Sequence, residues 1–305
     1  MPDPTDLYEF GSDLPDLRKP ALLCGLDGFV DAGGVGGLVR EQILNDLEHE
    51  VVATFDVDRL IDYRSRRPMM TYVEDHWETY DAPELALRLV HDGAGVPFLL
   101  LSGPEPDHEW ELFTAAAQGL IERLDVGLTV GFHGIPMAVP HTRPVGLTAH
   151  ATRPELVANY RQWLSRVDVP GSAAALLELR LGEAGRDALG FAVHVPHYLS
   201  QSAYPAAALT ALEAVSSATG LSFPDKELRE GAERANAEIA RQVEGSEEVA
   251  ETVRGLEQQY DAYVAAQQRN TAEVEMTDIP SADELGAQFE RFLAERDRGD
   301  DPPSR

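Results

Sequence analysis

The sequence has few of the features that stabilise secreted proteins or anchor proteins in membranes. It contains one cysteine, Cys24, in 305 residues, so no disulfide can form within the chain. No apolar run approaches the ~20 residues that cross a bilayer. The first residues, rich in proline and acids, do not resemble a secretory signal peptide. These features predict a cytoplasmic protein. Cys24 lies in an apolar run, where we expect a buried small side chain rather than a nucleophile.

Cationic side chains are scarce as well. The chain has 25 Lys and Arg residues against 53 Asp and Glu residues, a net charge of -28 at pH 7. Such a charge repels nucleic-acid phosphates and anionic lipid headgroups, so we expect neither nucleic acid nor a membrane as a partner. An apolar fraction of 43% is nevertheless sufficient for a hydrophobic core.

Short apolar runs alternate with longer amphipathic ones from about residue 20 to 220. This pattern predicts strands buried on both faces and alternating with helices, and hence a three-layer α/β/α sandwich with a mostly parallel sheet. An alternating segment, 71–80, predicts an edge hairpin. The predicted strands are residues 20–26, 50–56, 96–102, 126–132 and 188–195, with 145–150 as a weaker sixth.

Several helix starts can be recognised from their capping residues. Asp31 is expected to cap one helix, and Asp107 to cap another. Asp81 and Glu84, three residues apart, form a capping box that predicts a third helix. Further helices are predicted at residues 172–181 and 207–220.

From residue 225 onwards the sequence changes to charged helical segments without a strand signal. Apolar stripes at 228–243 and 249–263, and a capped segment at 280–293, predict helices that are too narrowly apolar to form their own core. They must pack on the α/β body, on each other or on another chain. We therefore predict a core domain at residues 18–222, a helical extension at 223–297, and flexible ends at 1–17 and 298–305.

Polar side chains follow the predicted strands, at the sheet edge where α/β proteins bind ligands. If the chain is an enzyme, Asp27 and Glu105 would supply acid or base groups, Arg143 would clamp an anion, and His133 would complete the set. Polar loops without a catalytic role are the alternative, since every α/β protein has them at this edge. The other side chains expected to line a pocket there are Asp31, Asp107, His108, His141, His194 and His197.

Established site motifs are absent. The glycine-rich segment 25–37 would expose backbone N–H groups to an anion, but it matches neither the dinucleotide-binding pattern nor the phosphate loop. Close helix–sheet packing is the preferred interpretation. The sequence also lacks HExxH, paired CxxC and GxSxG motifs, so we predict no metal, no cofactor and no nucleophile elbow.

Two further segments carry groups that can bind anions. The basic cluster YRSRRP (63–68) either holds an anion or acidic partner, or forms ion pairs within the chain, and the ion pairs are the preferred interpretation. The histidine- and proline-rich segment 131–151 is either a working loop or a stiff architectural one, and the architectural interpretation is preferred.

The order of several segments resembles the proteasome assembly chaperone 2 family, most closely its bacterial branch, typical of actinobacteria. The segments are GLDGFVDAGG, YRSRRP, LLLSGPEPDHEW, GFHGIPMAVPHTRP, HVPHYLSQSAYPAA and PSADELGAQFERFL. The resemblance covers nearly the whole chain. It implies oligomers and an α/β/α core similar to purine nucleoside phosphorylases and peptidyl hydrolases. Eukaryotic members scaffold the assembly of the proteasome α-ring without known catalysis, docking partly through a tail that ends hydrophobic–tyrosine–any residue. This sequence ends DRGDDPPSR and lacks that tail.

Two functional hypotheses follow. The preferred one is a non-catalytic, assembly-chaperone-like or scaffold protein, which self-associates through apolar faces of its body and C-terminal helices and binds protein partners. A proteasome-related partner is implied by the resemblance only. The alternative is a hydrolase or phosphorylase that acts on a small polar or nucleoside-like substrate in a cleft at the carboxyl ends of the strands.

Overall fold

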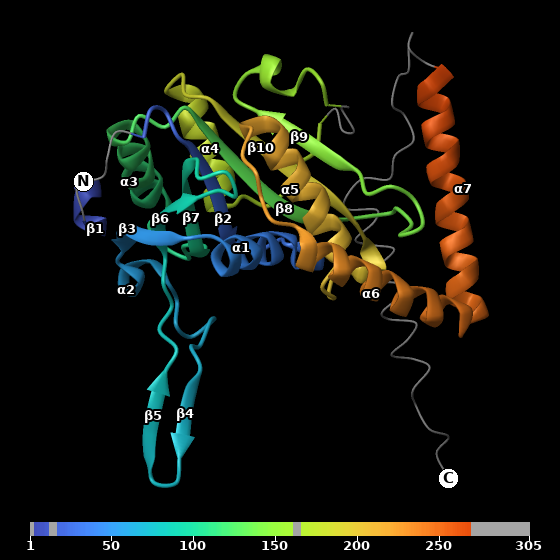
Figure 1. Cartoon of the computed structure of the whole chain (residues 1–305), viewed down its shortest axis with the longest axis horizontal. Coiled ribbons are helices and arrows are strands. Elements are labelled where there is room, and N and C mark those ends of the chain that lie inside the picture. Colours follow the sequence, from blue (N-terminus) through green and yellow to red (C-terminus); the bar gives the residue numbers. More distant parts are fainter. Residues whose placement is uncertain (1–2, 12–16, 161–165, 270–305) are drawn as a thin grey trace.

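A computed structural model of the chain describes residues 3–11, 17–160 and 166–269. Its centre is an eight-stranded sheet with the strand order β1-β3-β6-β7-β2-β8-β10-β9 (Figure 1). The strands of this sheet are β1 (Tyr8–Phe10), β2 (Ala21–Asp27), β3 (His49–Phe55), β6 (Ala86–His91), β7 (Pro97–Pro104), β8 (Leu128–Met137), β9 (Leu147–Ala151) and β10 (Ala188–Pro196).

The strand directions make the sheet mostly parallel, as predicted. β7, β2, β8 and β10 pair with one another in parallel. β3 runs in the same direction, because it is antiparallel to β6 and β6 is antiparallel to β7. Only β1, β6 and β9 run the other way. The carboxyl ends of five strands therefore lie at the same edge of the sheet.

Helices cover both faces and complete the three layers. α1 (Val35–Asp46) and α5 (Pro205–Thr219) pack on one face, and α3 (Trp110–Arg123) and α4 (Ala173–Glu183) on the other. Each face buries its own apolar cluster, and all nine residues of β10 are buried between the two. This double burial explains why the central strands are continuously apolar in the sequence. The short helical segments are η1 (Pro4–Leu7), η2 (Ala32–Gly34), α2 (Val57–Leu60), η3 (Pro154–Val157) and η4 (His197–Leu199).

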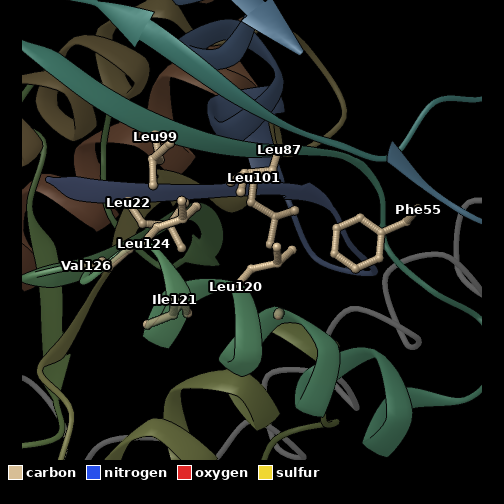
Figure 2. Close-up of a pocket in the computed structure, with 10 residues that line it drawn as sticks. Leu22, Phe55, Leu87, Leu99, Leu101, Leu120, Ile121, Leu124 and Val126 are labelled. Carbon is tan, nitrogen blue, oxygen red and sulfur yellow. The ribbon is translucent and has the colours of Figure 1, made fainter. Parts of the chain in front are cut away.

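A small cavity lies between the sheet and α3 (Figure 2). Its volume of about 10 Å³ is at the lower limit for one water molecule. Every lining side chain is apolar, so the cavity belongs to the core and offers no group for chemistry. The lining residues are Leu22, Phe55, Leu87, Leu99, Leu101, Ala117, Leu120, Ile121, Leu124 and Val126.

The six strands predicted from apolar runs are present, but the helix predicted from the Asp81–Glu84 capping box is not. Residues 86–91 form β6 instead, between β3 and β7. Five of its six residues are buried. The capping prediction was wrong because a short run buried on both faces is stabilised by pairing with two strands, which outweighs a local helix-start signal.

The predicted hairpin exists, but it does not join the edge of the main sheet. β4 (Met70–Val73) and β5 (His76–Tyr80) form a two-stranded sheet of their own. The hairpin projects from the body into solvent (Figure 1). We call residues 69–81 the arm, and residues 62–68, which lead into it, the arm base.

Two helices continue the chain beyond α5. In α6 (Lys226–Glu244), Leu228 and Ala232 are buried, and Leu228 belongs to the apolar cluster of α1 and α5. In α7 (Glu247–Arg269), Val253 and Leu256 are buried. Among the described residues, no helix has the length and apolarity that a membrane span requires. The helix predicted at 280–293 and the end predicted at 298–305 lie outside the described residues.

Candidate functional site

Glu105 lies directly after β7 and is tied to three other segments at the carboxyl edge of the sheet. Its N–H donates to the Asp27 carbonyl oxygen at 3.1 Å. Its buried carboxylate accepts one hydrogen bond from the Phe29 N–H at 3.2 Å and one from the Ala173 N–H, at the start of α4, at 2.6 Å. Arg66 of the arm base donates to its carbonyl oxygen. Glu105 thus fixes the β2 loop, α4 and the arm base to one another.

The glycine-rich segment after β2 is occupied by a carboxylate of the chain itself. Asp31 Oδ1 accepts from the N–H groups of Gly36 at 2.9 Å and Gly134 at 3.0 Å, and Oδ2 accepts from Gly37 at 3.2 Å. Gly33, with φ 70°, and Gly34, with φ 61°, make the turn in the left-handed region. Asp31 stands at the capping position of η2, and its side chain accepts from the first turn of α1, whose own capping position is Gly34. The N–H groups of Gly36, Gly37 and Gly134 are therefore engaged within the chain.

Asp107 and His108 lie beside the arm base. Asp107 accepts from the Asp62 N–H at 2.7 Å and pairs with Arg66 at 2.6 Å. Burial alone would raise the pKa of Asp107, but the hydrogen bond and charge of Arg66 hold it below its ordinary value. The prediction that Asp107 caps α3 was wrong: the capping position is Glu109, and Asp107 bonds to the arm base instead. His108 donates its backbone N–H to the Leu60 carbonyl oxygen.

His133 lies inside β8 rather than after it, because β8 continues to Met137. Burial, and then the neighbouring His150, lower the pKa of His133 below its ordinary value. The Nδ1 of His150 is 2.8 Å from Glu178 Oε1 of α4. The His150 ring lies over Gly190, where an added Cβ would come within 2.1 Å of it. No local spacing predicts the His150–Glu178 pair, since His150 lies in β9 and Glu178 in α4.

His194 is 1% exposed in β10, and its Nε2 is 2.8 Å from Thr148 Oγ1. Burial lowers the pKa of His194 to about 4, so the ring is neutral at pH 7. Cys24 is buried as expected, and burial, with the nearby negative charges of Glu105 and Glu178, raises the pKa of its thiol to about 12. A thiol with this pKa does not supply a thiolate nucleophile at neutral pH.

The segment between β8 and β9 connects the body to α7. The Tyr198 hydroxyl accepts from the His141 N–H at 2.9 Å and lies 2.7 Å from its Nδ1. The Tyr198 ring also meets the His197 ring edge-on. Arg143 donates two hydrogen bonds to Asp261, at 2.8 and 2.6 Å, and a third to Glu257 at 3.2 Å. Two carboxylates one turn apart on α7 thus hold the guanidinium.

The polar residues predicted at this edge are placed in several separate groups. Glu105 and Asp27 share a backbone hydrogen bond, and Asp27 forms an ion pair with Arg40 at the surface. Asp31 bonds to Gly134 of β8, and Asp107 pairs with Arg66 of the arm base. His194 contacts Thr148 of β9, and Arg143 pairs with Asp261 of α7. No group of three or more His, Cys, Asp or Glu side chains within the described residues could hold a metal ion. Whether any of these residues has a catalytic role stays a prediction.

Four large, exposed apolar side chains of the arm share one face. β4 and β5 pair Met70 with Tyr80 and Tyr72 with Trp77, with a register shift between the two pairs. Directly opposed residues point to the same side of a hairpin. The shift is necessary, because Trp77 and Tyr80 are three residues apart and would otherwise point to opposite sides. Trp77 is 63% exposed and Tyr72 56%. We call Met70, Tyr72, Trp77 and Tyr80 the aromatic face of the arm.

The fold and the polar groups at the carboxyl edge of the sheet define a three-layer α/β/α protein. It has a projecting hairpin and additional C-terminal helices. The model of the PAC2 family matches residues 25–243, and the chain belongs to this family. This is the proteasome assembly chaperone family that the sequence resembles. No match was found among curated proteins.

Solved structures have the same fold. The chain is similar to the Mycobacterium tuberculosis protein of unknown function Rv2714, with 46% identity, a TM-score of 0.82, and coverage of 85% of this chain and 92% of that chain. A Corynebacterium glutamicum protein of unknown function has 37% identity and a TM-score of 0.81, covering 85% and 98%. The Mycobacterium tuberculosis proteasome-assembly chaperone homologue Rv2125 has 24% identity and a TM-score of 0.70, covering 76% and 99%, which shows the shared fold.

Proposed function

We propose that this protein is a non-catalytic, assembly-chaperone-like scaffold of the cytoplasm, which binds protein partners and self-associates. The observation that carries the proposal is the contrast between two surfaces. At the sheet edge, the carboxylates of Glu105, Asp31 and Asp107 bond to groups of the same chain. On the arm, Trp, Tyr and Met side chains are exposed together.

The contrast between these two surfaces favours a protein-binding function over a catalytic one. Preformed ligand sites are concave and present convergent polar groups, whereas protein interfaces are enriched in aromatic residues and methionine. A two-stranded hairpin alone is marginally stable in water, so an extended arm gains stability when a partner covers it. Exposed patches of this kind mark interaction sites.

We infer the class of protein partner from the family and from the similar structures. One similar structure is called a proteasome-assembly chaperone homologue, and family membership supports the same class of partner here. We therefore propose proteasome subunits as heterologous partners. The acidic chain suits a partner with a basic surface, since opposite charges speed and orient association.

Binding to purified proteasome subunits tests the proposal. The full chain, titrated against the separate α- and β-subunits of the Mycobacterium tuberculosis proteasome, is expected to bind at micromolar concentration and to change the rate at which complete particles form. Analytical ultracentrifugation and the appearance of peptidase activity measure these two effects. Absence of both would contradict the proposal. Hydrolysis of small esters, or phosphorolysis of nucleosides, that is lost in a folded His133→Ala variant would favour the enzymatic alternative.

A further inference from the structure

We propose that the protein binds a small organic cation, an amine or a guanidinium compound, in an opening of the α3/α4 layer above β8. The inference goes beyond the proposed scaffold function and does not depend on it. It follows from a central strand that is uncovered on one face, from the polar side chains around that face, and from their charge.

The opening is evident from the burial pattern of β8. This strand lies between β2 and β10 in the sheet (Figure 1), and central strands of parallel sheets are normally buried on both faces, as all of β10 is. In the middle of β8, however, buried residues alternate with partly exposed ones. The buried Val130 and Phe132 belong to the apolar cluster of α1 and α5. Gly131, His133 and Ile135 therefore point to the α3/α4 face, where they are partly exposed.

Free space lies directly above Gly131. Apart from its neighbours in the chain, a Cβ added to this residue would meet no atom within 4 Å. In register beside Gly131 are Cys24 of β2 and Gly190 of β10. The His150 ring lies over Gly190, where a larger residue would displace it. Gly131 thus forms the floor of the opening, and the His150 ring lies on the neighbouring strand.

Hydrogen-bonding groups from three elements surround this floor. His150 of β9 bonds to Glu178 of α4 through Nδ1 and Oε1, and neither Nε2 of His150 nor Oε2 of Glu178 has a hydrogen-bond partner among the described residues. The His133 ring of β8 likewise forms no hydrogen bond to a residue that the structure describes, and Glu178 acts on its pKa. Convergent polar groups above a partly exposed strand are typical of a ligand site.

The charges around the opening are negative. Burial, the largest effect, and then a neighbouring imidazole lower the pKa of His133, whereas Asp31 and Glu178 raise it. Burial, and then Glu105 and Glu178, raise the pKa of the Cys24 thiol. No arginine or lysine is among these described groups. Three carboxylates therefore favour a positively charged ligand here and disfavour an anion such as phosphate.

An amine or a guanidinium compound matches the groups that are free to bond. Ammonium and guanidinium groups donate hydrogen bonds and accept none. The opening offers acceptors, namely Oε2 of Glu178 and the unprotonated ring nitrogens of His133 and His150. Ile135, partly exposed on the same face of β8, offers apolar surface to a short alkyl chain.

A matched series of small molecules tests the charge of the ligand. Butylammonium, 1-butanol and butyrate share one alkyl chain and differ in charge, and agmatine carries both an amine and a guanidinium group. By saturation-transfer NMR and calorimetric titration of the full chain, we expect the two cations to bind with millimolar affinity or better, and butanol at least tenfold more weakly than butylammonium. Butyrate is expected not to bind. Equal binding of butylammonium and butanol, or no binding of either cation, would overturn the inference.

Two pairs of variants locate the binding site. Gly131→Ala fills the opening without a clash, and we expect it to weaken agmatine binding at least tenfold. Gly119→Ala, at an exposed position of α3 with equally free space, should leave binding unchanged. Glu178→Gln removes a charge from the opening and should also weaken binding at least tenfold. Glu183→Gln removes one from the exposed end of the same helix and should have no effect.

Circular dichroism checks that the four variants are folded. Equal effects within either pair would place the cation elsewhere on the protein and overturn the inference. Binding to proteasome subunits tests the scaffold function separately, so its outcome and that of the cation titrations can be told apart.

Discussion

Asp27 and Asp31 lie four residues apart in the same glycine-rich segment and have different environments. Asp27 forms an ion pair with Arg40 at the surface, with its own side chain 48% exposed. Asp31 accepts three backbone hydrogen bonds, two from the first turns of α1 and one from β8. The contribution of a carboxylate to stability therefore depends on how many backbone N–H groups of the protein donate to it.

Replacing Asp31 with alanine is expected to lower the free energy of unfolding by about 2 kcal/mol or more, since three N–H groups lose their acceptor. Asp27→Ala is the matched control, and because exposed ion pairs contribute little, its expected effect is less than about 1 kcal/mol. Urea denaturation of both variants measures the difference. Equal losses would contradict the structural role of Asp31.

The lowered pKa of His194 predicts that the stability of the protein depends on pH. Its folded-state pKa of about 4 lies below the ordinary value of 6.5, so the unfolded chain binds a proton more readily. The contribution of His194 to the free energy of unfolding is fully present above the ordinary pKa of 6.5, and it is lost as the pH falls towards 4. Between pH 8 and pH 5 the loss is about 2 kcal/mol.

The His194 contribution can be isolated by comparison with a variant that cannot titrate. Urea denaturation of the native chain and of His194→Gln at pH 8 and pH 5 should show a smaller pH-dependent loss in the variant. The comparison cancels the other titrating groups, which both chains share. A loss of the same size in both would rule out His194 as its source.

At the scale of elements, the attachment of α7 depends on few contacts outside the helical extension. Arg143 and Thr142 contact Asp261 and Glu257 of α7 across more than 100 residues of sequence. The hydrogen bonds and charge of Asp261 raise the pKa of the Arg143 guanidinium further above its usual range, so Arg143 stays charged. These contacts join Thr142 and Arg143 of the histidine- and proline-rich segment to α7, and the architectural interpretation of the whole segment stays a prediction.

Arg143→Ala is therefore expected to loosen α7 without unfolding the body. Hydrogen exchange in α7 should become at least several-fold faster, while the midpoint of thermal unfolding changes by less than about 3 °C. Arg153→Ala is the matched control, because Arg153 makes a similar two-bond contact to Asp187 away from α7. Unchanged exchange in α7 after Arg143→Ala would show that other contacts hold the helix.

At the scale of the whole molecule, the division between core and extension at residues 222 and 223 stays a prediction. Leu228 of α6 is 5% exposed within the apolar cluster of α1 and α5. The buried side chains of α7, Val253 and Leu256, belong to neither of the two apolar clusters of the body. We infer that α6 stabilises the body more than α7 does.

Truncation measures this difference. A chain ending at residue 245 should retain a cooperative thermal transition close to that of the full chain. A chain ending at residue 222 should melt at least about 5 °C lower, because it uncovers the site of Leu228. Equal melting temperatures for the two truncations would support an independent core that ends at residue 222.

The sequence by itself determined the strands and helices wherever burial leaves a local pattern. β10 is apolar except for His194 because it is covered on both faces, and Asp31 precedes the helical turns that lead into α1. Only the tertiary structure decided that residues 86–91 form a strand, because pairing with β3 and β7 outweighs a capping signal. It also decided the partners of Glu105 and Arg143, which lie 68 and 118 residues away. A register shift in the arm turned an alternating segment into one aromatic face. Side chains that the fold brings together from distant segments form no recognisable spacing in the sequence. Only the tertiary structure therefore shows which polar groups bond within the protein and which apolar groups are exposed.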